Sequence, residues 1–212
     1  MIIAIDGPAA AGKGTLARRL ADHLGFAYLD TGMLYRAVGL KMLLEGHGMN
    51  DDEDAIDIAR TLGPADLQVD GLRGDDAAQA ASLVAAVPGV RDALLAFQRD
   101  FARRPPEGTA GAVLDGRDIG TVVCPDADLK LFITASTEVR AQRRVKELQE
   151  RGLEAIYARV LRDMQERDAR DSGRSVAPLE PATDAVVIDT SAMDADAAFA
   201  AALAEVDRRN AG

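Results

Sequence analysis

Short apolar runs alternate along the chain with longer segments in which apolar side chains recur at helical spacing. The short runs are typical of buried parallel strands and cover residues 2–5, 26–29, 112–114, 129–133 and 185–188. The longer segments predict helices over residues 15–24, 33–45, 53–62, 90–104, 138–151 and 153–171. A last helix is expected to begin near Ser191, whose Ser-x-x-Asp spacing to Asp194 fits a capping box. Strands that alternate with helices predict an α/β fold with a parallel, doubly wound sheet.

Two segments depart from this alternation. Residues 64–108 contain a polar, glycine-rich turn, an alanine-rich helix and proline-rich ends, which indicates an insertion or a small subdomain. Residues 140–174 hold ten Arg or Lys against seven Asp or Glu. This second segment is either a solvated helix pair with ion pairs between successive turns, or a cationic flap that closes on phosphate.

The composition excludes several classes of protein. The chain has 212 residues and a net charge of −10, which weighs against a nucleic-acid partner because phosphate contacts need a basic surface. A single cysteine, Cys124, excludes a disulfide framework. The first residues lack the basic region of a signal peptide, and no window approaches the roughly 20 apolar residues that a membrane span needs. We therefore expect a cytoplasmic protein with no membrane partner. A monomer is also expected, although the composition does not determine the oligomeric state.

A phosphate-binding loop is predicted between the first strand and the first helix. It follows the pattern Gly-x4-Gly-Lys and runs Gly7-Pro8-Ala9-Ala10-Ala11-Gly12-Lys13-Gly14-Thr15. Glycines and small residues allow backbone N–H groups to surround a phosphate, and the helix N-terminus and Lys13 add positive charge. The usual Ser or Thr after the lysine is replaced by Gly14, so Thr15 is only a candidate ligand for Mg²⁺, and no residue is assigned as a direct metal ligand.

Five further motifs follow the loop: Asp30-Thr31-Gly32-x-x-Tyr35-Arg36, Ala81-Ser82-x-Val84-Ala85, Pro88-x-Val90-Arg91, Asp115-Gly116-Arg117-Asp118-x-Gly120-Thr121 and Arg167-Asp168-x-Arg170-Asp171-x-x-Arg174. With the loop, these motifs resemble the nucleoside monophosphate kinases, and within them the bacterial type of the cytidylate kinase family. They lie in order over about residues 2–190.

The resemblance implies a P-loop three-layer sandwich with a five-stranded parallel sheet. It also implies a core (1–30, 109–139 and 175–212), a monophosphate-binding subdomain with an insertion (31–108) and a helical lid (140–174). The implied reaction is transfer of the γ-phosphoryl of ATP to CMP or dCMP, with Mg²⁺ as cofactor. Such a transfer depends on positioning and on neutralisation of phosphate charge.

The resemblance also implies roles for individual residues. Lys13 would hold the donor, while Thr31, Arg36, Arg117 and Arg174 would bind the acceptor. Arg144 and Arg167 of the lid, with Arg140 and Arg143, are candidates to contact the donor and transferring phosphates. Arg174 would share the catalytic role with Lys13, Arg144 and Arg167, and Arg167 would also bind the acceptor. For each of these lid arginines a plain surface ion pair is the alternative.

Cytosine recognition can be argued from hydrogen bonding. A carboxylate accepts from the cytosine N4 amino group, and by resemblance Asp118 has this role, with Ser82 and Arg91 facing N3 and O2. Uracil would present an oxygen there instead, so we expect CMP to be preferred to UMP. Asp171 resembles the ligand of the sugar hydroxyls, and Asp115 either acts near Mg²⁺ through water or is a turn carboxylate. The alternatives are an ion pair for Asp171, a cap for Asp118 and a buried helix hydroxyl for Ser82.

Three other functions compete with this hypothesis. A kinase with the same loop could instead act on UMP or on shikimate. A regulatory GTPase would need the guanine-reading pattern Asn-Lys-x-Asp, which does not occur in the sequence. A nucleic-acid binder could use residues 140–174, but the acidic charge and the aromatic content of 4% disfavour it.

Overall fold

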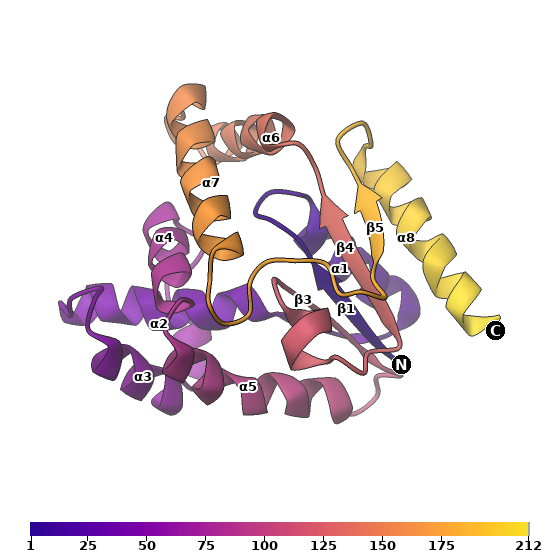
Figure 1. Cartoon of the computed structure of the whole chain (residues 1–212), viewed down its shortest axis with the longest axis horizontal. Coiled ribbons are helices and arrows are strands. Elements are labelled where there is room, and N and C mark those ends of the chain that lie inside the picture. Colours follow the sequence, from indigo (N-terminus) through magenta and orange to yellow (C-terminus); the bar gives the residue numbers. More distant parts are fainter. Residues whose placement is uncertain (212) are drawn as a thin grey trace.

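The computed structural model describes residues 1–211, in which five parallel strands form one sheet (Figure 1). The strands are β1 (Ile2–Asp6), β2 (Ala27–Asp30), β3 (Ala112–Gly116), β4 (Leu129–Thr134) and β5 (Val186–Asp189). Their order across the sheet is β2-β3-β1-β4-β5, and every neighbouring pair is parallel. The fold class and the positions of all five predicted strands are therefore confirmed.

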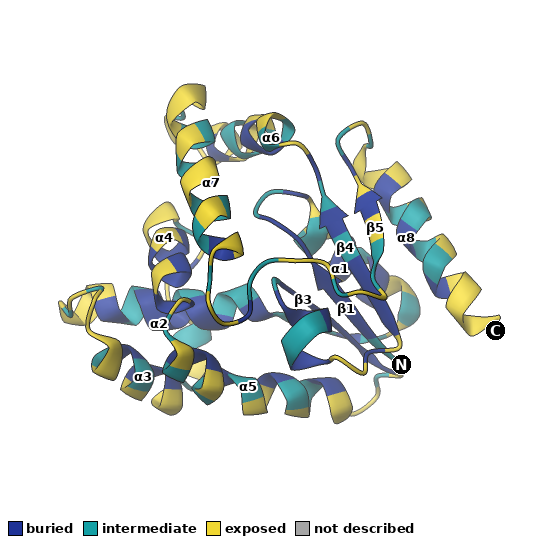
Figure 2. Ribbon diagram, in the orientation of Figure 1, coloured by how far each residue is buried: buried dark blue, intermediate teal, exposed yellow. Residues whose placement is uncertain are grey.

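The sheet is covered on both faces because successive residues of β1 point to opposite sides. Ile3 and Ile5 pack in a core cluster with α1 (Lys13–Leu24) and α8 (Ala195–Asn210). Ala4 packs in a second cluster with residues of α5 (Pro88–Arg103) and of a π turn, Ile119–Val123. Figure 2 shows the central strands buried between these two helical layers.

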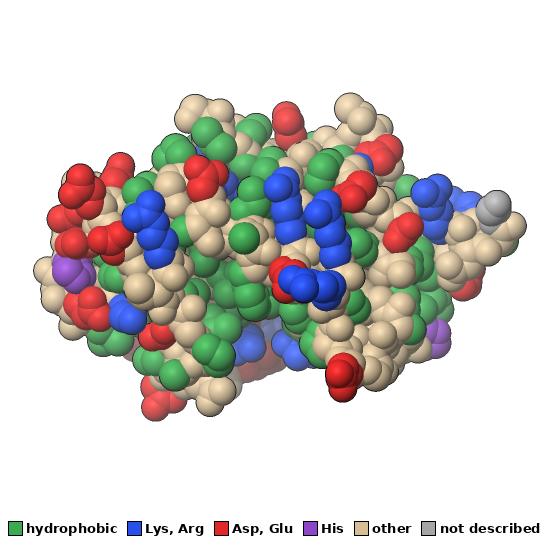
Figure 3. Space-filling view, turned by 90° about the horizontal axis from the view of Figure 1, so that it is seen from below, with side chains coloured by type: hydrophobic (Ala, Val, Ile, Leu, Met, Phe, Trp, Pro, Cys, Tyr) green, Lys and Arg blue, Asp and Glu red, His purple; other side chains and the backbone are tan. Residues whose placement is uncertain are grey.

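A second group of helices lies beside the sheet. It contains α2 (Thr31–Glu45), α3 (Asp52–Thr61), α4 (Asp75–Val84) and the first turns of α5, with a 3₁₀ helix at Pro64–Gln68. These helices share a core of their own that includes Leu34, Val38 and Val90. Figure 3 shows acidic side chains gathered at one end of this side of the molecule, and the first turn of α3 is wholly acidic. The predicted alanine-rich helix within residues 64–108 is α4.

Two helices, α6 (Thr137–Glu150) and α7 (Tyr157–Ser172), stand over the carboxyl ends of the strands (Figure 1). Gly152 ends the first of them in a left-handed conformation, with φ of 73°, which glycine adopts without strain. The second helix begins at Tyr157, four residues later than predicted. Among the described residues no single helix is long and apolar enough to cross a membrane, although α4 and α5 together, bent by 103°, have the length and composition.

The prediction that Ser191 caps the last helix is wrong. The N-cap of α8 is Asp194, whose carboxylate accepts hydrogen bonds from the N–H groups of Asp196 and Ala197. The hydroxyl of Ser191 instead donates to the carboxylate of Asp189, at 2.6 Å. Asp194 is a strong cap by itself, so the helix begins at the next residue.

Gly39 allows α2 and α4 to approach closely, and its replacement is expected to destabilise the protein. A Cβ at this position would lie 2.7 Å from the Cβ of Ala80 and 2.9 Å from the N of Ala81. Because both atoms belong to a packed helix, Gly39→Ala should lower the free energy of unfolding by about 1–3 kcal/mol, measured by urea denaturation. The control is Gly48→Ala, where an added Cβ has no neighbour within 4 Å. Equal losses in the two variants would contradict the packing explanation.

Candidate active site

The loop between β1 and α1 has the backbone that anion binding requires. Ala10 and Gly12 adopt left-handed conformations, with φ of 57° and 90°. At Gly7 an added Cβ would lie 1.9 Å from the carbonyl oxygen of Ile133, so only glycine fits there. The helix begins at Lys13 without a side-chain cap, which leaves the first N–H groups of α1 directed into the loop. The predicted phosphate loop therefore has the expected geometry.

Lys13 lies beside carboxylates from the ends of two strands. Burial, then repulsion from Arg117, lowers the pKa of Lys13 to about 8, although Asp115 and Asp30 oppose the shift. Burial also raises the pKa of Asp115 to about 7, and Asp30 adds to this shift while Lys13 counteracts it. The two groups thus stabilise each other's charge in a desolvated position.

The residues near Lys13 fit a hydrated magnesium ion on a bound phosphate. Carboxylate oxygens are the ligands that Mg²⁺ prefers, and the repulsion between Asp30 and Asp115 would be relieved by a cation. An added Cβ at Gly14 would lie 3.2 Å from Oδ2 of Asp115, so the glycine brings this carboxylate close to the loop. Thr15 and Asp115 line different cavities. Among residues 1–211 no group of three His, Cys, Asp or Glu is arranged to hold a metal by itself.

Three arginines converge on one buried carboxylate, Asp171. Arg117 Nε lies 3.1 Å from its Oδ2, Arg174 pairs with its Oδ1, and Arg167 Nε lies 3.8 Å away. Burial opposes the charge of Asp171, but the three arginines outweigh it and lower the pKa of the carboxyl group. Within the described part of the chain, Nε of Arg167 and Nε of Arg174 have no hydrogen-bond partner. The cluster carries more positive than negative charge and is therefore suited to an anion.

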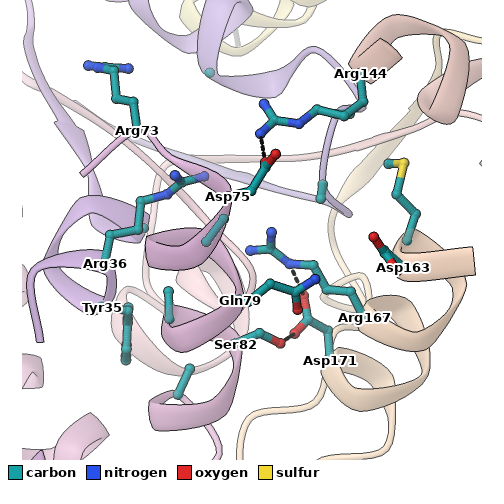
Figure 4. A pocket seen from close by; sticks show the side chains of 18 of the residues that line it. Tyr35, Arg36, Arg73, Asp75, Gln79, Ser82, Arg144, Asp163, Arg167 and Asp171 are labelled. Carbon is teal, nitrogen blue, oxygen red and sulfur yellow. Dashed lines mark hydrogen bonds and ion pairs between the residues drawn. The ribbon is translucent and has the colours of Figure 1, made fainter. Parts of the chain in front are cut away.

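Two further arginines reach the same space from other helices. Figure 4 shows Arg36, Arg144 and Arg167 extending toward one another from α2, α6 and α7. Arg36 donates to the carbonyl oxygens of Leu72 and Gly74, and burial lowers its pKa. Arg144 forms ion pairs with Asp75 of α4 and with Glu147. The ion pair with Asp75 bridges α6 to the second helical group.

Asp118 and Arg91 form a buried ion pair at the inner end of the site. Their side chains are 7% and 8% exposed. Arg91 also donates to the carbonyl oxygen of Ala85 and lies over the ring of Tyr35, 5.4 Å from its centroid. Asp118 and Tyr35 outweigh the effect of burial and raise the pKa of Arg91. The alternative role of Asp118 as a cap is not supported, since its side chain makes no cap hydrogen bond.

Thr31 and Ser82 are already engaged in hydrogen bonds. The hydroxyl of Thr31 donates to the carbonyl oxygen of Asp115, at 2.7 Å, so its donor is committed to the backbone. The hydroxyl of Ser82 donates to Oδ1 of Asp171, at 3.2 Å. Both side chains are almost fully buried. Both hydroxyl groups therefore use their hydrogen within the protein, and toward a substrate they can act only as hydrogen-bond acceptors.

Most of the predicted site residues line one cavity of about 750 Å³. They are Ala9, Ala10, Lys13, Gly14, Thr31, Arg36, Ser82, Arg91, Arg117, Asp118, Arg144, Arg167, Asp171 and Arg174. A second cavity, of about 240 Å³, lies on the other side of the loop and is lined by Ala11, Gly12, Thr15 and Arg143. Gly7 and Pro8 line neither cavity. Arg73, Asp75 and Gln79 also line the large cavity, and no motif in the sequence indicated them.

Arg140 and Arg143 contact the loop rather than the large cavity. Arg140 is 3% exposed, pairs with Asp168 at 2.6 Å and donates to the carbonyl oxygen of Ala9. Arg143 donates to the carbonyl and hydroxyl oxygens of Thr190 and to the carbonyl oxygen of Ala11. Arg140 therefore forms a buried ion pair that joins α6 to α7. Arg143 instead holds the loop in place beside the second cavity.

A phosphate loop after the central strand of a parallel sheet, with arginines from several helices facing it, defines the class of P-loop kinases. The chain belongs to the cytidylate kinase family, whose profile matches residues 3–208. It is 68% identical over 202 residues to the cytidylate kinase of Paramagnetospirillum magneticum, covering 95% of each chain. It is 62% identical over 203 residues to the cytidylate kinase of Rhodospirillum rubrum, covering 96% of this chain and 95% of that one. The predicted family is thus confirmed.

Solved structures of more distant proteins share the fold. A protein of unassigned function from Eubacterium ventriosum aligns with a TM-score of 0.54 at 15% identity, over 98% of both chains. A sugar kinase from Janibacter sp. HTCC2649 aligns with a TM-score of 0.50 at 15% identity, over 97% of this chain and 94% of that chain. At this identity the likeness concerns the fold alone.

Proposed function

We propose that this protein transfers the γ-phosphoryl group of ATP to CMP or dCMP, giving ADP and CDP or dCDP. The observation that carries the proposal is the convergence of cations from separate stretches of the chain on one cavity beside the phosphate loop. Two nucleotides repel each other through their phosphates, and Lys13, Arg36, Arg117, Arg167 and Arg174 supply the opposing charge. The names of the close relatives support the choice of acceptor.

The donor nucleotide would bind on the loop side of the site. The N–H groups at the start of α1 and the ammonium group of Lys13 would hold the ATP phosphates. The cavity beyond the loop, lined by Gly12, Thr15 and Arg143, has room for the rest of the nucleotide. Asp115 and Asp30 would hold a magnesium ion through water, where it supplies charge neutralisation on the phosphate oxygens.

The acceptor would bind between the second helical group and α7. Its phosphate fits the cluster of Arg36, Arg117 and Arg174, whose planar guanidinium groups can each bind two oxygens. Asp171 was predicted to bind the sugar hydroxyls. Both of its oxygens already accept from side chains in this structure, so it also orients Arg117 and Arg174 toward the phosphate.

The transfer itself would be a direct in-line displacement. One acceptor phosphate oxygen forms a bond to the γ-phosphorus while the bond to the oxygen that bridges the β- and γ-phosphates breaks, and ADP leaves with that electron pair. The acceptor phosphate is already ionised, so no general base is needed. We propose that residues 31–108 are the acceptor subdomain, that residues 140–174 are a lid which excludes water, and that the remaining residues form the core.

The choice of base is tested by Asp118→Asn with CMP, dCMP, UMP and AMP as acceptors in a coupled ADP-release assay. The asparagine oxygen can still accept from Arg91, but the new amide donor opposes the N4 amino group of cytosine and favours O4 of uracil. We expect the ratio of kcat/KM for CMP to that for UMP to fall by about 100-fold or more.

The matched control is Asp126→Asn, an exposed carboxylate in the segment that follows the π turn. It is expected to leave the ratio unchanged. A ratio for Asp118→Asn that equals the wild-type ratio would remove Asp118 from the base-reading role. A wild-type enzyme that phosphorylates UMP or AMP better than CMP would overturn the proposed function itself.

A further inference from the structure

The π turn Ile119–Val123 directly follows Asp118, the residue proposed to read the base. In this turn the N–H groups of Val123 and Cys124 bond to carbonyl oxygens five residues earlier, those of Asp118 and Ile119. Such turns are rare and occur mainly at functional sites, because their wide backbone needs support from elsewhere. Here the support comes from two side chains that are distant in sequence, Asp6 and Arg99.

Asp6 holds the start of the turn. Its Oδ1 accepts from the N–H of Ile119 and its Oδ2 from the N–H of Gly120, both at 2.7 Å. The carboxylate is 5% exposed, and burial raises its pKa to about 6 against the effect of these two hydrogen bonds. A Cβ at Gly120 would lie 3.1 Å from Cδ of Lys130 and 3.4 Å from Oδ2 of Asp6, so a side chain there would crowd the contact.

Arg99 holds the end of the turn. Its Nη2 donates to the carbonyl oxygen of Val122 at 2.9 Å, and its Nε donates to that of Val123 at 3.0 Å. Arg99 lies on α5, the helix that also carries Arg91, the partner of Asp118. Asp6 thus accepts hydrogen bonds from the first N–H groups of the turn, and Arg99 donates to its last carbonyl groups.

Asp6 connects the phosphate loop, on the donor side of the active site, to Asp118 on the acceptor side. Asp6 is the last residue of β1 and is followed by Gly7 of the phosphate loop, while its carboxylate fixes the backbone next to Asp118. A shift of the turn would move the Asp118 carboxylate relative to the acceptor base. Hydrogen-bond discrimination between bases falls steeply with such a displacement, because donor and acceptor must lie within about 3 Å.

We propose that Asp6 and Arg99 are positioning residues for acceptor selectivity, which act by clamping the π turn that orients Asp118. The inference rests on the proposed function and adds two residues that do not line the substrate cavity. The groups that face Asp6 are Asp118, which precedes the turn, Cys124, which follows it, Lys13 from α1, and, beyond Gly120, the aliphatic part of Lys130 from β4.

The test compares Asp6→Asn, Arg99→Ala and Arg99→Lys by kcat/KM for CMP and UMP. In Asp6→Asn an amide donor must face one of two backbone N–H groups, so the turn has to move. We expect the CMP to UMP ratio to fall about tenfold in Asp6→Asn and in Arg99→Ala, with KM for ATP changed less than about twofold. Arg99→Lys retains one donor and should recover part of the ratio. Arg103→Ala, an exposed residue of the same helix, is the control and should match the wild type.

The dependence on pH distinguishes positioning from a general loss of stability. Asp6 accepts two N–H groups only when ionised, so the wild-type CMP to UMP ratio should decrease as the pH falls from 8 through about 6. Both acceptors carry the same phosphate, so its own titration cancels in the ratio. In Asp6→Asn the ratio should not change with pH in this range.

Each outcome decides between the alternatives. If Arg99→Ala and Asp6→Asn both keep the wild-type ratio of kcat/KM for CMP to that for UMP, even with a lower melting temperature, then Asp6 and Arg99 do not position Asp118. The proposed function would be unaffected by that result. If Asp6→Asn does not fold, Arg99→Ala, Arg99→Lys and the wild-type pH profile still decide. Absence of CMP phosphorylation by the wild type would instead overturn the proposed function.

Discussion

Replacing Lys13 with alanine is expected to lower kcat by about 10³-fold, the largest single effect in the site. The ammonium group lies in a desolvated position beside Asp115 at the start of α1, where an electrostatic interaction is stronger than in water. In the transition state negative charge builds on the oxygen that bridges the β- and γ-phosphates, as its bond to the γ-phosphorus breaks, so the loss should affect kcat more than KM for ATP. Steady-state kinetics with saturating CMP measure both constants.

Lys146→Ala is the matched control for Lys13. The Lys146 side chain is 78% exposed and pairs with Glu150 on the same helix, so kcat should stay within about twofold of the wild type. Circular dichroism of both variants checks that the fold is retained. A Lys13→Ala enzyme with more than a tenth of the wild-type kcat would show that Lys13 does not hold the transferring phosphoryl group.

Arg174→Ala is expected to lower kcat/KM for CMP by about 10²- to 10³-fold, mainly through a higher KM for CMP. Arg174 is one of three arginines that share the single carboxylate of Asp171, and among residues 1–211 its Nε has no hydrogen-bond partner, so the cluster keeps net positive charge for an acceptor phosphate. Asp171 keeps Arg117 as a partner in the variant, and the fold should therefore survive. Measuring KM for CMP and for ATP separately shows which nucleotide is affected.

The control for this prediction is Arg208→Ala on the outer surface of α8. Its side chain is 71% exposed and pairs with Glu205, far from the cavity residues. It should leave both Michaelis constants unchanged. If Arg174→Ala instead raised KM for ATP and left KM for CMP at the wild-type value, the arginine would belong to the donor site.

The strands and the phosphate loop could be predicted because their signals are local. The run Ile2–Asp6 is apolar and β-branched, and the glycine pattern after it has few other structural explanations. The motifs that resemble cytidylate kinases also placed Arg117, Asp118 and Asp171 near one another. The structure brings them to one cavity: Arg117 and Asp118 lie there because they follow the carboxyl end of β3, and Asp171 reaches the same cavity from α7.

The remaining features depend on contacts between distant residues. Arg144 meets Asp75, which is 69 residues away, and Arg140 meets Asp168 after the chain has turned back along α7. No local pattern distinguishes these arginines from the others in a basic segment. The π turn could not be predicted either, since its backbone is supported by Asp6 and Arg99, which are distant in sequence.

The position of β1 has a consequence for how the molecule can move. This strand is hydrogen-bonded on both sides, to β3 and to β4, so the loop at its end rests on the part of the sheet that is hardest to deform. The second helical group joins the sheet at β2 and β3, and the pair α6 and α7 joins it at β4 and β5. Across the cavity the two groups meet through polar contacts such as Arg144 with Asp75 and Ser82 with Asp171. We therefore expect these outer helices to move when nucleotides enter and leave, while the phosphate loop stays in place.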